Sequence, residues 1–131
     1  MQVQRRNNVR AIGEGPVTLI FGHGFGCDQR MWRFVAPSFS DRYRVVAYDL
    51  VGSGRSDLSA YFPHKYDRLD GYAQDLLEVI EAFGQGPVML VGHSVSTMIG
   101  VLADRLKPGL IAGHIMVGPS PRDIDDEDYV G

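Results

Sequence analysis

Short apolar segments alternate with longer amphipathic ones along this chain of 131 residues, and that alternation constrains its fold more than any other feature. The short segments are apolar at nearly every position rather than at every second one, which is typical of strands buried on both faces. Such strands, when helices separate them, form a mostly parallel sheet covered by helices. The pattern predicts a single α/β domain over 1–131, with strands at 8–12, 17–21, 44–48, 88–91 and 111–117.

Three of the intervening segments have apolar residues at helical spacing. Leu69 to Phe83 is the clearest helix, and Gly84 follows it directly. Val95 to Leu106 is the second, stopped by a Lys-Pro-Gly sequence. Asp28 to Phe39 is predicted as one short helix with Asp28 near its N-cap.

Glycine-rich loops follow three of the predicted strands, at 22–26, at 52–54 and from Gly92 onward. Ligand sites of open parallel sheets lie beyond the carboxyl ends of the strands, so these loops are expected to converge on one edge. The Gly-Ser-Gly at 52–54 is compatible with phosphate binding, but the longer phosphate-loop pattern is absent and a tight turn is favoured.

Composition excludes several classes of function. The net charge of −3 does not favour nucleic-acid binding, and no apolar run is long enough to span a membrane. The single Cys27 offers neither a disulfide nor a metal cluster, and no signal-peptide pattern follows Met1, so a cytoplasmic protein is expected. The acidic residues between 123 and 128 are interpreted as a solvated loop.

The sequence Gly92-His93-Ser94-Val95-Ser96 joins a predicted strand to a predicted helix. A serine hydroxyl becomes a useful nucleophile when a strained strand-to-helix turn holds it clear of the chain and a base activates it. The backbone N–H of Val95, at the start of the helix, is then placed to stabilise a developing oxyanion. Ser96 stands where the general pattern has glycine.

A second oxyanion donor is expected from His23-Gly24-Phe25-Gly26, which follows the strand at 17–21. Hydrolases with a serine on such a turn carry a loop of this kind after an earlier strand, and its backbone N–H completes the oxyanion hole. We assign that N–H to Phe25. The order of strand, His-Gly-Phe-Gly loop, strand and serine turn is more specific than either motif alone.

Five segments carry a resemblance to a known family: GHGFGCDQRMW, VVAYDLVGSGRSD, LDGYAQDL, VGHSVSTMIGVLA and MVGPSPR. They resemble the α/β-hydrolase subfamily of the bacterial sigma-B stress-pathway regulator and the plant strigolactone and karrikin receptor hydrolases. Serine at position 96 is usual in the plant receptors. The resemblance implies Ser94 as nucleophile, Phe25 and Val95 as oxyanion-hole donors, and the side chains of Phe25 and Val95 at the floor of an apolar substrate pocket.

A catalytic histidine is not apparent in this sequence. In this fold the triad follows the order Ser, acid, His, and His114, the one histidine after Ser94, falls inside a predicted strand. His93 is expected to pack or form hydrogen bonds, His23 to brace the oxyanion loop, and His64 to lie at the surface.

The acids give no better candidate for the triad. Asp28 is interpreted as a helix cap, Asp49 as a brace for the following loop, and Asp75 as part of a helix face. The resemblance explains this, because family members are about twice as long and carry the acid and histidine in their other half. We therefore expect this chain to be the N-terminal portion, without the lid and the last strands, and to leave the edge of its final strand unpaired.

Three functions remain open at this point. The first is a serine hydrolase acting on an ester or lactone of a small apolar molecule, with no metal or organic cofactor. The second, implied by the resemblance, is a slow small-molecule receptor that engages a regulatory protein partner. The third is a truncated chain that has no activity by itself, because Ser94 lacks its base.

Overall fold

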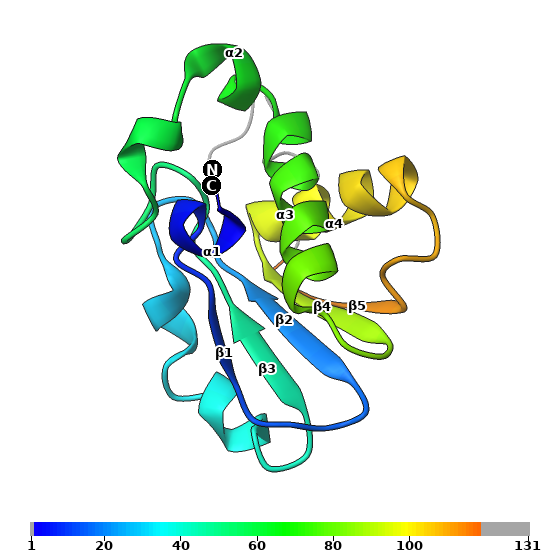
Figure 1. The fold of residues 1–131 in the computed structure, drawn as a ribbon. Helices are drawn as coiled ribbons and strands as arrows, with labels where there is room; N and C mark the ends of the chain where they lie inside the picture. Colours follow the sequence, from blue (N-terminus) through cyan, green and yellow to red (C-terminus); the bar gives the residue numbers. More distant parts are fainter. Residues whose placement is uncertain (1, 119–131) are drawn as a thin grey trace.

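The computed structural model describes residues 2–118, which form a five-stranded sheet flanked by helical segments (Figure 1). The strand order is β1-β3-β2-β4-β5. Strand β1 pairs with β3 in antiparallel orientation, and all other pairs are parallel. The strands are β1 (Arg10–Ile12), β2 (Thr18–Gly22), β3 (Arg44–Ala47), β4 (Val88–His93) and β5 (Gly113–Val117).

The helices cover the two faces of the sheet unequally. The longer helices α3 (Leu69–Phe83) and α4 (Val95–Leu106) pack over one face together with α1 (Val3–Arg6). The short helix α2 (Pro63–Tyr66) packs against α3 beyond the carboxyl ends of the strands (Figure 1). The other face carries short 3₁₀ segments at Gln29–Trp32 and Ala36–Phe39, and a third 3₁₀ segment spans Leu58–Ala60.

The sheet has a core on each of its faces, as its apolar strands require. Ile20, Val46 and Leu90 point into the core under α3 and α4. Their neighbours Leu19 and Val45 point into the smaller core, where Trp32 lies. Because adjacent residues of a strand face opposite sides, a strand that is apolar throughout fills both cores. Every residue of β2, the central strand, is buried.

The predicted α/β class and the predicted helices at 69–83 and 95–106 are confirmed. The prediction of one helix over Asp28–Phe39 is wrong, because the segment forms two separate 3₁₀ turns. Pro37 lies in the first turn of the second segment and has no N–H, so an α-helix running through it would lose a hydrogen bond. The predicted cap is correct, since the Asp28 carboxylate accepts a hydrogen bond from Arg30 N at 2.8 Å.

Strand β5 forms one edge of the described sheet, and Ile115, Met116 and Val117 are each more than 40% exposed. Among residues 2–118 no strand pairs with its outer side, as expected. The acidic residues 123–128 lie outside the described residues. Within the described range, none of the helices is both long and apolar enough to cross a membrane.

A buried ionic cluster fixes α3 to the preceding chain. Asp75, which is 1% exposed, accepts hydrogen bonds from Lys65 Nζ and from Tyr66 OH, both at 2.7 Å. Arg6 Nη2 of α1 lies 3.3 Å from the same carboxylate. Burial, and then the hydrogen bond to Asp75, raise the pKa of Tyr66, so its hydroxyl stays a donor. The sequence placed Asp75 on a helix face without indicating this role.

Asp75→Asn is expected to destabilise the domain by roughly 3 kcal/mol, because it removes the charge that compensates Arg6 and Lys65 in a buried site. Urea unfolding followed by circular dichroism measures the loss. Glu81→Gln is the matched control on the same helix, since Glu81 forms an exposed ion pair with Lys107 and its loss should cost less than about 1 kcal/mol. Equal effects of the two substitutions would contradict this role of Asp75.

Candidate active site

The loops after β2, β3 and β4 converge at the carboxyl edge of the sheet, as predicted. Leu50 N, after β3, donates a hydrogen bond to His23 Nε2, after β2, at 2.9 Å. Ser96 Oγ, after β4, donates to the His23 carbonyl oxygen at 2.5 Å. His23 is fully buried and therefore joins the three loops into one unit.

Ser94 occupies the turn between β4 and α4 in a strained conformation, with φ 55° and ψ −117°. Residues other than glycine seldom adopt positive φ, and positions that do are enriched at functional sites. Two hydrogen bonds hold the turn: Ser94 N donates to Val117 O at 3.0 Å, and Thr97 N donates to Ser94 O at 2.9 Å. The predicted serine elbow is thus present as a backbone conformation.

Ser96 fits the position where the general pattern has glycine, because its neighbours are glycines. A Cβ on Gly22 would lie 2.8 Å from Ser96 Oγ, and one on Gly92 would lie 3.1 Å from the Ser96 carbonyl carbon. Strands β2 and β4 therefore have glycine at the positions that face the Ser96 side chain and backbone of α4. Sequence reasoning identified Ser96 as an anomaly but not its hydrogen bond to His23.

The loop after β2 lies directly against the serine elbow. A Cβ on Gly24 would be 3.4 Å from Ser94 Cβ and 2.7 Å from His93 Nδ1, so only glycine fits without displacement. Cys27 N donates to Gly24 O at 3.1 Å and closes the loop into a turn. The close approach of Gly24 thus brings the His-Gly-Phe-Gly motif and Ser94 together.

The two expected oxyanion donors differ in the surroundings of their side chains. Phe25 is 55% exposed, and its ring contacts the edge of Tyr72 at 6.0 Å between centroids. Val95 is 1% exposed and packs in the core beneath the elbow. Val95 begins α4, whose first N–H groups have no partner within the helix and whose dipole is positive at this end.

The tautomer of His23 follows from its hydrogen bonds. Leu50 N–H donates to Nε2, which must therefore be unprotonated, and Nδ1–H is left to donate to Gly24 O at 2.8 Å. Both ring nitrogens are thus engaged in holding the loop. His23 braces the loop at residues 23–26, as predicted.

The remaining histidines lie in three different surroundings. His64 is exposed on α2, as predicted. His93 packs against Gly24, and the ring of His114 in β5 lies 3.2 Å from the Cβ that Gly100 would carry. The structure places His114 inside a strand, where the sequence put it.

The predicted bracing role of Asp49 is also confirmed. Asp49, 1% exposed, accepts hydrogen bonds from Gln29 N at 2.9 Å and from Arg55 N at 3.0 Å. Ser56 Oγ accepts one from Gly52 N, so the glycine loop at 52–54 is a tight turn, as favoured. No group of three metal-ligating side chains occurs among residues 2–118.

Comparison with known proteins agrees with this geometry. Residues 19–130 match the family model described as the alpha/beta hydrolase family. The chain belongs to the α/β-hydrolase family. It is 40% identical to the Karrikin insensitive 2 receptor CA of Petunia hybrida over 98% of its length, and 44% identical to the strigolactone esterase D14 of Arabidopsis thaliana over 95%. The expected resemblance to the receptor hydrolases is confirmed.

A solved structure shows the same arrangement. A hydrolase from Oleispira antarctica superposes with a TM-score of 0.85 at 39% identity over 98% of this chain. The match covers 48% of that hydrolase, as it covers 48% of the petunia receptor and 46% of the Arabidopsis esterase. This α/β-hydrolase chain therefore spans about half the length of the relatives it matches.

Ser96→Ala is expected to destabilise the chain by about 1–2 kcal/mol, since it leaves the buried His23 carbonyl without its donor. Urea unfolding measures the change. Ser59→Ala is the control, because Ser59 Oγ bonds Asp57 at an exposed site and its loss should fall within about 0.5 kcal/mol. A neutral Ser96→Ala would mean that the hydrogen bond to His23 contributes nothing to the elbow.

Proposed function

We propose that Ser94 is the nucleophile of a serine hydrolase that cleaves an ester or lactone of a small, largely apolar molecule. The observation that carries the proposal is the positive φ of Ser94 at the junction of β4 and α4. Strain of 1–3 kcal/mol at a non-glycine residue persists only where the surroundings enforce it, and it holds a nucleophile clear of the backbone.

The proposed reaction begins with attack of Ser94 Oγ on the carbonyl carbon of the substrate. A histidine accepts the serine proton, and the backbone N–H groups of Phe25 and Val95 donate to the oxyanion. The histidine then protonates the leaving alcohol as the acyl-enzyme forms. Water, deprotonated by the same histidine, attacks the acyl carbon and releases the acid and Ser94. The chemistry requires no cofactor.

The histidine and the acid that orients it are proposed to come from sequence outside this chain. Support comes from the described residues: His23 uses both ring nitrogens in the loop, and His64 is exposed on α2. Asp49 and Asp75 already accept several hydrogen bonds each. The substrate pocket is proposed to lie above the exposed Phe25 ring, with Val95 in its floor, in a protein of the cytoplasm.

A second candidate function is a receptor that turns over slowly and engages a regulatory protein. Its support is the similarity to the petunia protein, which is named a receptor, alongside the Arabidopsis protein, which is named an esterase. Both functions use the same serine elbow, so the difference lies in turnover rather than in Ser94.

Fluorophosphonate labelling read by intact mass tests the nucleophile. The 131-residue chain, shown to be folded by circular dichroism, should not be labelled, because an unactivated serine hydroxyl is a poor nucleophile. A longer protein that contains the chain and its downstream sequence should gain one adduct, which Ser94→Ala abolishes. Labelling at a residue other than Ser94 would refute the assignment, and labelling of the 131-residue chain at Ser94 would refute an outside base.

Turnover of an aryl ester by that longer protein separates the two functions. A hydrolase should release product continuously, whereas a receptor should give one burst per protein followed by a very slow phase. Ser94→Ala should lower kcat by at least about 10⁴-fold in the first case. Unchanged turnover in Ser94→Ala would contradict both functions.

A further inference from the structure

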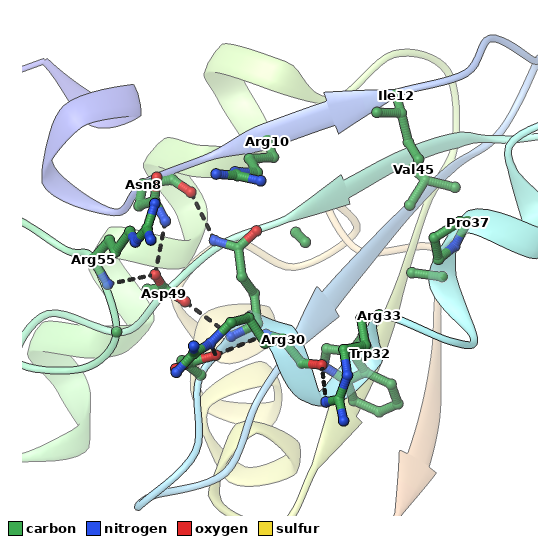
Figure 2. Close-up of a pocket in the computed structure, with 15 residues that line it drawn as sticks. Asn8, Arg10, Ile12, Arg30, Trp32, Arg33, Pro37, Val45, Asp49 and Arg55 are labelled. Atoms are coloured by element: carbon green, nitrogen blue, oxygen red, sulfur yellow. Dashed lines mark hydrogen bonds and ion pairs between the residues drawn. The ribbon is translucent and has the colours of Figure 1, made fainter.

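A cavity among the described residues lies away from the serine elbow. Its volume is ≈ 660 Å³, and it opens between strands β1 and β3 and the 3₁₀ segments at Gln29–Trp32 and Ala36–Phe39 (Figure 2). Neither Ser94, Phe25 nor Val95 lines it. A volume of this size is within the range of about 300–1,000 Å³ that is usual for small-molecule sites.

One end of the cavity is apolar. Figure 2 shows Ile12 of β1, Val45 of β3 and Pro37 together at this end, with Trp32 below them. Ala36 and Ala47 complete the lining, and their small side chains leave the space open. This end suits an apolar chain or ring, because burying such a group removes hydrocarbon from water.

The other end is basic. Four arginines and two aspartates line the cavity as a whole. Figure 2 shows Arg10 and Arg55 at the end near Asp49, whereas Arg33 lies beside Trp32. Arginine forks bind carboxylates well because two parallel N–H groups match the two oxygens. The charged lining consists of Arg10, Arg30, Arg33, Arg55, Asp28 and Asp49.

The two aspartates do not neutralise the remaining arginines. Asp28 is bound by the Arg30 guanidinium at 2.8 Å, and the hydrogen bonds from Arg30 lower the pKa of Asp28 to about 2. The Asp49 carboxylate accepts hydrogen bonds from Asn8 Nδ2 and from two backbone N–H groups. Among residues 2–118, the guanidinium groups of Arg10, Arg33 and Arg55 form no ion pair with a carboxylate.

We propose that this cavity binds a small amphipathic carboxylate, with its apolar body between Ile12, Val45 and Pro37 and its carboxylate against Arg10 and Arg55. The site lies at the β1 side of the sheet, and β2 and β4 separate it from β5. The proposal does not rest on hydrolysis at Ser94, so each can fail without the other.

The single tryptophan of the chain gives a local measurement, since Trp32 lines this cavity and is the sole tryptophan in the sequence. Octanoate is the probe, titrated into the Ser94→Ala chain while tryptophan emission and calorimetric heat are recorded. Saturable binding of one octanoate per chain is expected, with a matching change in emission. 1-Octanol, which lacks the charge, should bind at least tenfold more weakly.

Arginine variants locate the carboxylate. Arg10→Gln and Arg55→Gln should each weaken octanoate binding at least tenfold. The Arg55→Gln variant keeps the backbone N–H at position 55 that donates to Asp49. Arg105→Gln is the matched control, because Arg105 is exposed on α4, which contacts the opposite edge strand β5. Equal binding of octanol, unchanged binding by both variants, or heat without a change in emission would each overturn the proposal.

Discussion

The close approach of β2 to the first turn of α4 is the constraint on which the rest of the site depends. Gly22 and Gly92 carry no side chains there, so Ser96 reaches the His23 carbonyl, and Gly24 comes against Ser94. A positive φ at Ser94 costs on the order of 1–3 kcal/mol, and hydrogen bonds of about 1 kcal/mol each at Ser94 N, Ser94 O and Ser96 Oγ offset it. The loop at residues 23–26 and the serine elbow are therefore held by the same contacts.

Most of the fold could be predicted because the local sequence of each element indicates its secondary structure. A strand that is apolar at every position can be recognised from its own residues alone. The same holds for the helical spacing of apolar residues in α3 and α4. The segment 28–39 failed for a local reason as well: its apolar spacing is helical, but Pro37 lacks the donor that a continuous α-helix needs. In this segment the effect of Pro37 outweighed the helical spacing of the apolar residues.

The bracing residues of the site were predictable where they stand in a loop next to a motif, as His23 and Asp49 do. The roles of Ser96 and Asp75 were not, since His23, the partner of Ser96, and Arg6, one of the partners of Asp75, lie far away in the sequence. Arg6 contacts Asp75 because α1 packs on α3. No sequence pattern around either residue predicts this ion pair. Pairs of this kind follow from tertiary packing, which sequence periodicity does not encode.

His23 and Asp49, two titratable residues at the carboxyl edge of the sheet, already form the hydrogen bonds that hold its loops. The Asp49 carboxylate accepts hydrogen bonds from two backbone N–H groups and from Asn8 Nδ2, while the N–H of Leu50, the next residue, fixes the tautomer of His23. A carboxylate that accepts several N–H groups is a weak partner for a further histidine, and a histidine with both nitrogens engaged is a poor base. Residues 2–118 thus supply a rigid serine elbow beside the loop at residues 23–26. The proposed proton transfer is accordingly assigned to groups outside residues 2–118.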